Sequence, residues 1–192
     1  MKLLEEKILE CGKILPGGIV KVDSFLNHQL DITFIDKMGE EFYRIFGHLG
    51  ITKILTVEAS GIGIACLISR HFGNVPVVFA KKNQSSNQST DLLTSKVHSF
   101  TKGIDFLIRV DRKYISPDDK ILIIDDFLAN GNAMMGLIDI VDQAGAETAG
   151  VGICIEKAFQ PGGDLLRKRG VNLYSLAIVD IDENGSPFFV SK

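Results

Sequence analysis

Residues 121–133, which read Ile-Leu-Ile-Ile-Asp-Asp-Phe-Leu-Ala-Asn-Gly-Asn-Ala, decide the fold of this chain. The four apolar residues at the start predict a strand that is buried on both faces, as in a parallel sheet covered by helices. The small residues after it let backbone N–H groups approach an anion, and a helix predicted over 133–144 adds the positive end of its dipole. Because open α/β sheets bind ligands at the carboxyl ends of their strands, we expect the main chain to bind a phosphate group here. The predicted phosphate-binding residues are Ala129, Asn130, Gly131, Asn132 and Ala133.

Two adjacent carboxylates, Asp125 and Asp126, stand at the predicted end of this strand. Buried carboxylates need hydrogen-bond donors, cations or a proton, so the two cannot both be dry and ionised without partners. Ribose hydroxyl groups are suitable donors, and a nearby Mg²⁺ relieves the repulsion between the two charges. The alternative is an acidic, solvated turn that contains Asn-Gly, which is a common structure. The combination of buried strand, paired acids, small-residue loop and apolar helix favours a site for a phosphorylated sugar.

Three separated blocks of sequence carry a resemblance to a known family. The pattern hydrophobic-hydrophobic-Asp-Asp-x-x-x-x-Gly at residues 123–131 resembles the phosphoribosyl diphosphate signature of type I phosphoribosyltransferases. With Lys-Val-Asp-Ser-Phe-Leu-Asn-His-Gln at 21–29 and Ile-Glu-Lys-Ala-Phe-Gln-Pro-Gly at 155–162, the chain resembles bacterial xanthine phosphoribosyltransferases over almost its whole length. Asn130 stands where most of the wider family carries Thr, and the xanthine enzymes share this departure.

The resemblance implies a fold, an activity and a set of partners. The implied fold class is α/β, a type I phosphoribosyltransferase fold with a mainly parallel central sheet flanked by helices. It includes a small hood built from the N-terminal and C-terminal segments, in a single domain of residues 1–192. The implied reaction converts xanthine and phosphoribosyl diphosphate to xanthosine 5′-monophosphate and pyrophosphate, in purine salvage. The implied cofactor is Mg²⁺, held mainly by phosphoribosyl diphosphate with no protein ligand assigned, and the implied assembly is a homodimer.

Recognition of the base requires other residues, because a phosphate site does not distinguish purines. Asn27 can both donate and accept hydrogen bonds, and Lys157 offers a cation to an oxo group, which suits a 2,6-dioxopurine. By themselves, these two residues are better explained as a turn residue and a solvated lysine. The resemblance implies that both bind xanthine, together with a backbone position at Val20. Phe159 is expected either to pack on the base or to pack locally beside Pro-Gly.

The sequence shows no arrangement typical of a covalent nucleophile, and its four histidines have no metal-ligand spacing. Displacement of pyrophosphate at the anomeric carbon does not need a nucleophilic side chain, because a purine nitrogen attacks while positive charge builds on the ribose. Catalysis then depends on positioning, on Mg²⁺ that neutralises pyrophosphate, and on carboxylates near the sugar. Asp125 and Asp126 are therefore the candidate catalytic residues, chiefly through the ribose hydroxyls.

A second anion site is expected where another predicted strand ends and a helix begins. Small residues there let N–H groups reach pyrophosphate, and the family's pyrophosphate loop falls at the same strand end. A dinucleotide motif fits poorly, because Cys66 occupies the position of its third glycine. The candidate residues of this pyrophosphate loop are Glu58, Ala59, Ser60 and Gly61.

Residues 81–90 form a polar segment that begins with Lys81 and Lys82. Composition alone favours a plain surface loop. The position after a strand end, with two cations, also allows a lid that covers a polyanion and excludes water. The resemblance favours a lid at about residues 81–103, with both lysines near the phosphates.

The rest of the chain alternates between apolar runs and helical spacing, which predicts βαβ units and a parallel sheet. Asp31 is expected to cap a helix whose apolar stripe includes Ile32, Ile35, Phe42 and Phe46. The other predicted helices are an N-terminal one through residues 4–11, then 61–72 and 164–168. The predicted strands are 52–57, 75–80 and 148–156, an extended segment at 19–25, and a hairpin of 173–180 with 186–190 around Asn-Gly.

Composition limits the classes of protein that the chain can represent. Its 192 residues are 45% hydrophobic and 23% charged, with a formal charge of −3, which suits one globular domain. Basic residues form no stripe in the sequence, so we expect no nucleic-acid partner. No run has the length of a membrane span and the N-terminus lacks a signal-peptide core, so we expect a cytoplasmic protein with no membrane contact. Cys11, Cys66 and Cys154 are expected to be reduced core thiols.

Three rival functions remain open. A hypoxanthine or guanine phosphoribosyltransferase would have the same sugar site and differ only in its base pocket. A regulator that senses phosphoribosyl diphosphate without catalysis would need a DNA-reading module, for which too few residues precede Asp31. A dinucleotide-dependent oxidoreductase ranks lowest, because the glycine fingerprint is missing.

Overall fold

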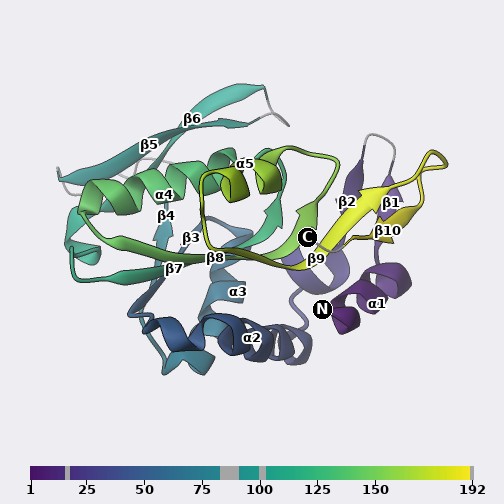
Figure 1. Cartoon of the computed structure of the whole chain (residues 1–192), viewed down its shortest axis with the longest axis horizontal. Helices are drawn as coiled ribbons and strands as arrows, with labels where there is room; N and C mark the ends of the chain where they lie inside the picture. The colour runs from purple at the N-terminus through teal and green to yellow at the C-terminus, as the bar shows by residue number, and fades with distance from the viewer. Residues whose placement is uncertain (16–17, 83–90, 100–102, 191–192) are drawn as a thin grey trace.

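The computed structural model describes residues 1–15, 18–82, 91–99 and 103–190, and its centre is a six-stranded sheet between two layers of helices (Figure 1). The strand order is β10-β9-β8-β7-β3-β4. All neighbouring strands run parallel except β9 and β10, which are antiparallel. The strands are β3 (Lys53–Val57), β4 (Val77–Ala80), β7 (Lys120–Leu128), β8 (Glu147–Lys157), β9 (Leu173–Ile181) and β10 (Pro187–Phe189).

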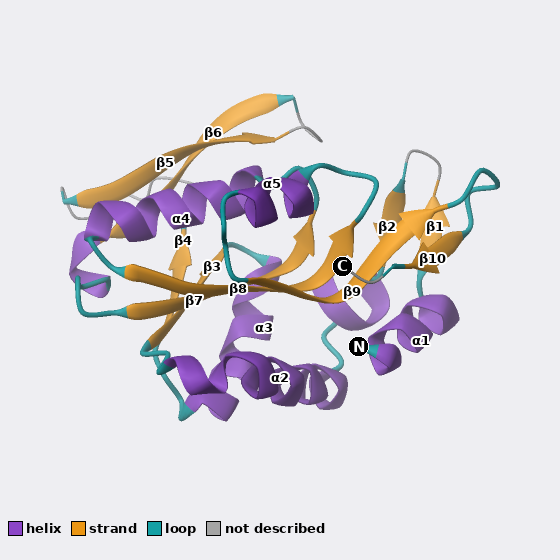
Figure 2. Ribbon diagram, viewed as in Figure 1, coloured by secondary structure: helices purple, strands orange, loops and turns teal. Residues whose placement is uncertain are grey.

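The central strand β7 is apolar on both faces, as its sequence predicted. Leu122 and Ile124 belong to one core with α1, α2 and α3, whereas Ile121 and Ile123 belong to a second core with α4 and α5. Figure 2 shows α4 and α5 on one side of the sheet and α2 and α3 on the other. The helices are α1 (Lys2–Cys11), α2 (Ile32–Phe46), α3 (Ser60–Ser69), α4 (Asn132–Ala144) and α5 (Gly162–Lys168).

Helix α2 begins where the sequence predicted. The side chain of Asp31 accepts a hydrogen bond of 3.1 Å from the backbone N–H of Phe34, which satisfies a donor that the helix leaves unpaired. Phe42 and Phe46 are fully buried. Ile32 was wrongly placed in the buried stripe: it is the first residue of the helix, and 52% of it is exposed.

Two short hairpins flank the main sheet. The first joins β1 (Lys13–Leu15) to β2 (Ile19–Lys21), and the second joins β5 (Leu92–Ser99) to β6 (Ile104–Asp111). The predicted extended segment at 19–25 is correct only as far as Lys21, because residues Asp23–Asn27 form one π-helical turn. Short 3₁₀ turns occupy Gly47–Leu49, Arg70–Phe72 and Arg112–Tyr114.

The β5–β6 hairpin packs directly on α4, and Gly136 makes this close approach possible. A Cβ atom at Gly136 would lie 2.7 Å from Val97 Cγ2 and 3.1 Å from Ile108 Cδ1. This hairpin occupies part of the predicted lid. Residues 83–90 and 100–102 of that prediction lie outside the described residues, so closure over the site stays a prediction.

The cysteine prediction is wrong for two of the three residues. Cys154 lies fully buried on β8, but Cys11 at the end of α1 and Cys66 on α3 are exposed. Cys66 faces away from the buried side of α3, which carries Ile64, Ala65 and Ile68. Among the described residues, no helix is long and apolar enough to cross a membrane.

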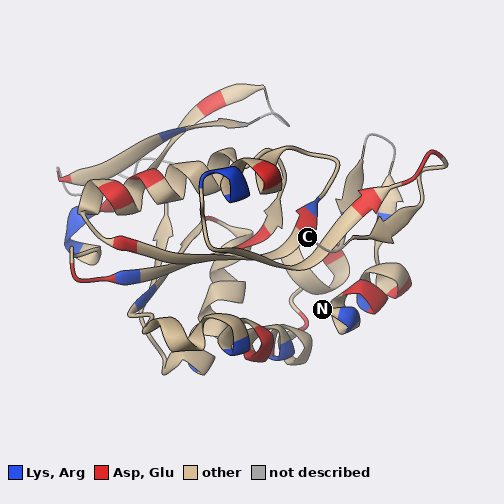
Figure 3. Ribbon diagram, viewed as in Figure 1, with Lys and Arg blue, Asp and Glu red and all other residues tan. Residues whose placement is uncertain are grey.

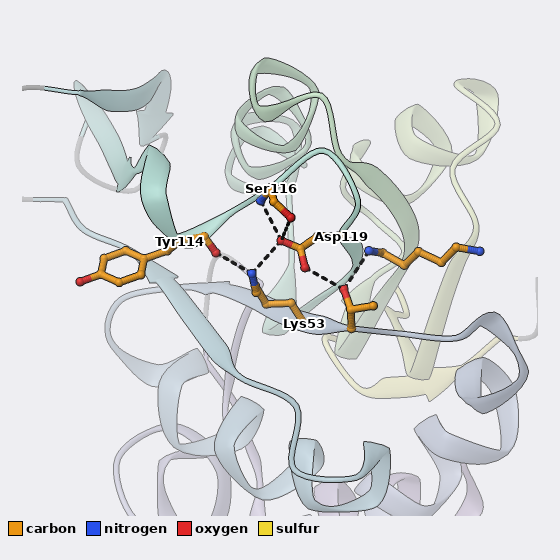
Figure 4. A network of polar contacts seen from close by, with 6 residues as sticks. Lys53, Tyr114, Ser116 and Asp119 are labelled. Atoms are coloured by element: carbon orange, nitrogen blue, oxygen red, sulfur yellow. Dashed lines mark hydrogen bonds and ion pairs between the residues drawn. The ribbon is translucent and has the colours of Figure 1, made fainter.

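A polar network lies at the amino-terminal ends of β3 and β7 (Figure 4). Lys53 Nζ is 2.7 Å from Asp119 Oδ2 and 2.7 Å from the carbonyl oxygen of Tyr114. The backbone N–H of Ser116 and the hydroxyl of Thr52 also donate to Asp119, at 2.8 and 2.9 Å. Burial by itself would raise the pKa of Asp119, but these donors outweigh it and hold that pKa below its usual value. The network therefore ties the start of β3 to the chain that enters β7.

Replacing Asp119 by Asn is expected to lower the free energy of unfolding by about 2 kcal/mol, because Lys53 loses its charged partner. The folded-state pKa of Asp119 lies below its usual 3.8, so this stabilisation is present above that value. It disappears as the pH falls through the lower folded-state pKa. Urea unfolding of both proteins from neutral to acidic pH measures the difference, and exposed Asp118→Asn is the matched control. A difference that persists unchanged in strong acid would contradict the prediction.

Candidate active site

The two predicted catalytic acids are buried near the carboxyl end of β7. Asp125 and Asp126 are only 6% and 8% exposed. The backbone N–H of Asp126 donates to Asp125 Oδ1 at 3.0 Å, and that of Phe127 donates to Asp126 Oδ1 at 3.0 Å. Strand β7 continues to Leu128, so the two acids lie inside the strand near its end and not in the loop after it. Burial, and next the charge of Asp126, raise the pKa of Asp125 well above its usual value. A proton is therefore held more readily at this carboxyl than in water.

The predicted pyrophosphate loop packs against these acids. A Cβ atom at Gly61 would lie 2.0 Å from Thr56 Oγ1 and 3.1 Å from Asp125 Oδ1, so only glycine fits without a shift. The loop from Glu58 to Gly61 connects β3 to α3, and Ser60 is the first residue of that helix. The structure therefore brings together two segments that are distant in the sequence.

Lys81 and Lys82 join this loop to the β5–β6 hairpin. The backbone N–H of Lys82 donates to the Glu58 carboxylate, and Lys82 Nζ lies 5.7 Å from the centre of the Phe106 ring. Lys81 exchanges two backbone hydrogen bonds of 2.9 and 3.0 Å with Arg109 on β6. Both lysines therefore lie beside the predicted anion loop, and both also contact the hairpin.

The predicted phosphate loop lies between β7 and α4 and is backed by the start of α5. Gly131 has φ +85°, a left-handed conformation that favours glycine, and its carbonyl accepts from Met135 N–H at 2.9 Å. The Gly162 N–H donates to the carbonyl of Ala129 at 2.9 Å. A pocket opens in front of the loop. Its lining consists of Val97, His98, Phe106 and residues 127–134.

Asn132 contributes more than its backbone to this pocket. Its side-chain amide donates to the carbonyl oxygen of His98 at 3.0 Å, which fastens the end of β5 to the first residue of α4. The His98 ring in turn contacts Asp105, with 2.6 Å between Nδ1 and Oδ1. The alternation of buried Leu93, Ser95 and Val97 with exposed residues was the sequence signal for this strand, and it was missed.

Lys157, the predicted base contact, ends β8 and is half buried. Its Nζ lies 3.4 Å from the carbonyl oxygen of Gly18 and 5.4 Å from the centre of the Phe127 ring. Burial lowers the pKa of Lys157 below its usual value. Phe127 was not predicted as a site residue, yet it lines the pocket in front of the predicted phosphate loop and faces the lysine. The sequence signal that could have identified Phe127 is its position directly after the acid pair.

The other predicted base residues are near this region without contacting Lys157 in the described part of the chain. Val20 is 5% exposed on β2, two residues after Gly18. Asn27 ends the π-helical turn, which packs against α3. The ring of Phe159 lies against Gly18, which is distant in the sequence, because a Cβ atom at Gly18 would lie 2.8 Å from that ring. These contacts build the small hood from N-terminal residues and the end of β8.

The described residues contain no group of three His, Cys, Asp or Glu side chains placed to hold a metal ion. Mg²⁺ characteristically binds through one or two carboxylates and substrate phosphates, with water completing its shell. Asp125 and Asp126, which lie beside the two predicted anion loops, fit that incomplete donor set. Along the described chain, Lys and Arg are interspersed with Asp and Glu (Figure 3).

Comparison with known proteins identifies the family. The model of the phosphoribosyl transferase domain matches residues 23–171. The chain is 55% identical over 185 residues to xanthine phosphoribosyltransferase of Ruminiclostridium cellulolyticum, covering 96% of this chain and 97% of that one. It is 57% identical to xanthine phosphoribosyltransferase 2 of Clostridium botulinum over 98% of this chain and 100% of the relative. Identity to the xanthine phosphoribosyltransferase of Bifidobacterium adolescentis is 53%, over the full length of both chains.

Solved structures show the same fold at low sequence identity. APRTase from Giardia lamblia aligns with a TM-score of 0.75 at 18% identity, over 94% of this chain and 98% of that one. Adenine phosphoribosyltransferase from Saccharomyces cerevisiae aligns with a TM-score of 0.72 at 18% identity, over 92% and 99% of the two chains.

The fold and the matching domain define an enzyme of the phosphoribosyltransferase class, a group of pentosyltransferases that use Mg²⁺ with phosphoribosyl diphosphate. This chain belongs to that family, and within it to the group of the bacterial xanthine phosphoribosyltransferases. The type I fold that the sequence predicted is confirmed.

Replacing Gly61 by Ala is expected to raise the KM for phosphoribosyl diphosphate at least tenfold, because the new methyl group displaces the pyrophosphate loop from Thr56 and Asp125. Steady-state kinetics with varied phosphoribosyl diphosphate measure this effect. Adding Thr56→Ala removes the nearest obstructing atom, so the double variant is expected to recover part of the loss, with Thr56→Ala alone as reference. An unchanged KM in Gly61→Ala would contradict the assigned loop.

Proposed function

We propose that this protein is a xanthine phosphoribosyltransferase, which converts xanthine and phosphoribosyl diphosphate to xanthosine 5′-monophosphate and pyrophosphate in purine salvage. The observation that carries the proposal is the identity of 53–57% to enzymes of that name over essentially the whole chain. The arrangement of an acid pair, two anion loops and a half-buried lysine at one edge of the sheet supports it.

The sugar phosphate is assigned to the edge where β7 ends. The phosphate group binds to the backbone N–H groups of residues 129–133 and to the positive end of α4. The ribose hydroxyls reach Asp125 and Asp126, and the pyrophosphate group reaches residues 58–61 with Lys81 and Lys82. Gly61 lies against Asp125, so one extended ligand can contact all of these groups at once.

The reaction is a displacement at the anomeric carbon of the ribose. A purine nitrogen forms the new bond to carbon while the bond to the pyrophosphate oxygen breaks, and positive charge develops on the ring. Asp125 and Asp126 bind the ribose hydroxyls and place negative charge near the developing cation. The chemistry that Mg²⁺ supplies when bound is neutralisation of charge on the departing pyrophosphate. Because burial raises the pKa of Asp125, this carboxyl can also take up a proton.

Base selection is assigned to the hood. The ammonium group of Lys157 donates to an oxo group of the purine, and its low hydration in this half-buried position strengthens that contact. Asn27 and the backbone of Val20 complete the polar contacts. Phe127 offers an apolar surface beside the lysine.

Besides the site residues assigned above, four features stay predictions under this proposal. They are closure of a lid at about residues 81–103, the homodimer, the single-domain organisation and the cytoplasmic location. The homodimer is tested by sedimentation equilibrium of the purified protein. A monomer at every concentration used in the assay would contradict it.

A Mg²⁺-dependent assay with each of four purine bases tests the function. Xanthine is expected to be the best substrate, and removal of Mg²⁺ by a chelator is expected to abolish turnover. A higher kcat/KM for hypoxanthine or guanine than for xanthine would instead identify the protein as a hypoxanthine or guanine phosphoribosyltransferase. Tight nucleic-acid binding at low salt, with no pyrophosphate released, would favour the regulator.

Two kinds of variant separate the sugar site from the base site. Asp125→Asn and Asp126→Asn are expected to reduce kcat/KM by a similar factor for every base, at least about a hundredfold. Lys157→Ala is expected to reduce it mainly for xanthine and guanine, and least for adenine, which carries no oxo group for a cation to contact. Equal loss for all bases in Lys157→Ala would remove this residue from base selection. Exposed Lys168→Ala is the matched control.

A further inference from the structure

Helix α5 has no place in the proposed chemistry, yet its first residue forms the back wall of the phosphate loop. Gly162 N–H donates to the carbonyl oxygen of Ala129 at 2.9 Å. A Cβ atom at Gly162 would lie 2.4 Å from that oxygen and 2.6 Å from the nitrogen of Gly131. The two backbones therefore touch, and the position of the loop depends on the position of α5.

A seven-residue helix with two glycines at its start has little stability of its own. Contacts with residues outside the helix must therefore hold α5 in place. The strongest polar contacts that the structure records for α5 come from Arg167 in its last turn. Arg167 Nη1 and Nη2 lie 2.6 and 2.7 Å from the two carboxylate oxygens of Glu156.

Glu156 is an unusual anchor, because it is only 1% exposed on β8. The Ser175 hydroxyl on β9 donates to its Oε2 at 2.6 Å, so the carboxylate connects two sheet strands to the helix. A Cβ atom at Gly163 would lie 2.0 Å from Glu156 Oε1, which shows how closely the helix approaches. Such a bidentate salt bridge between guanidinium and carboxylate fixes both the distance and the orientation of the two groups.

We propose that Glu156, Arg167 and Ser175 form a positioning cluster for the phosphate loop, acting through α5 and Gly162. The cluster sets the distance between the sheet and the loop that receives the phosphate of phosphoribosyl diphosphate. None of its three residues touches substrate. The proposal rests on the assignment of residues 129–133 to that phosphate.

The neighbour of Glu156 in the chain allows the proposal to be tested sharply. Lys157 points into the hood, so a general disturbance of β8 would weaken xanthine binding. A displaced phosphate loop would instead weaken binding of phosphoribosyl diphosphate. The two KM values therefore distinguish the two routes.

Glu156→Gln keeps the shape of the side chain and an acceptor for Ser175 but removes the charge. It is expected to raise the KM for phosphoribosyl diphosphate roughly tenfold, with the KM for xanthine and kcat within about twofold of native. Arg167→Lys keeps the charge but loses the paired geometry, so an intermediate increase is expected. All kinetics are measured well below the melting temperature of each variant.

Lys53→Met is the matched control, because it breaks a largely buried ion pair at the amino-terminal ends of the sheet strands. It is expected to lower the melting temperature without changing either KM. The proposal is overturned if Glu156→Gln and Arg167→Lys also lower only the melting temperature, or if they raise the KM for xanthine alone.

Gly131→Ala separates this inference from the assignment of the phosphate loop itself. It places a methyl group at a left-handed position, 3.1 Å from Gly162 Cα. If it raises the KM for phosphoribosyl diphosphate and Glu156→Gln does not, the loop assignment stands and the positioning cluster fails. If Gly131→Ala leaves that KM unchanged, the loop assignment and the cluster both fail.

Discussion

The site depends on the close packing of Gly61 against Thr56 and Asp125. There is no room for a side chain at Gly61, so the loop after β3 lies directly on the acid pair of β7. This contact brings the predicted pyrophosphate loop against the acid pair of the neighbouring parallel strand. Burial keeps the Asp125 carboxyl away from water and raises its pKa, although the backbone N–H of Asp126 already donates one hydrogen bond to it. Under the proposed function, ribose hydroxyls supply its further partners.

Much of the fold was predictable because its decisive signals are local. The apolar run at 121–124 predicted a strand covered on both faces, and Asp31 predicted the start of α2. The loop between β7 and α4 was predictable for the same reason, and its small residues are the basis for assigning a phosphate to it. The acid pair was chosen as a candidate site from its position beside that loop.

The remaining parts depend on contacts between distant residues, which periodicity does not report. Nothing local indicates that Lys82 binds Glu58, or that Asn132 holds β5 through His98. The β5–β6 hairpin alternates buried and exposed residues, but its polar Ser95 weakened the signal. In the sequence, Glu156 is indistinguishable from any other residue of a predicted apolar strand. Only the structure shows its bidentate salt bridge to Arg167 of α5.

The most direct measurement is a crystal structure of the protein with phosphoribosyl diphosphate and Mg²⁺. The account predicts the phosphate within hydrogen-bond distance of the backbone N–H groups of residues 129–133. It also predicts the ribose hydroxyls on Asp125 and Asp126, and the pyrophosphate at residues 58–61. A sugar phosphate bound away from the end of β7, or both carboxylates turned toward solvent, would contradict it.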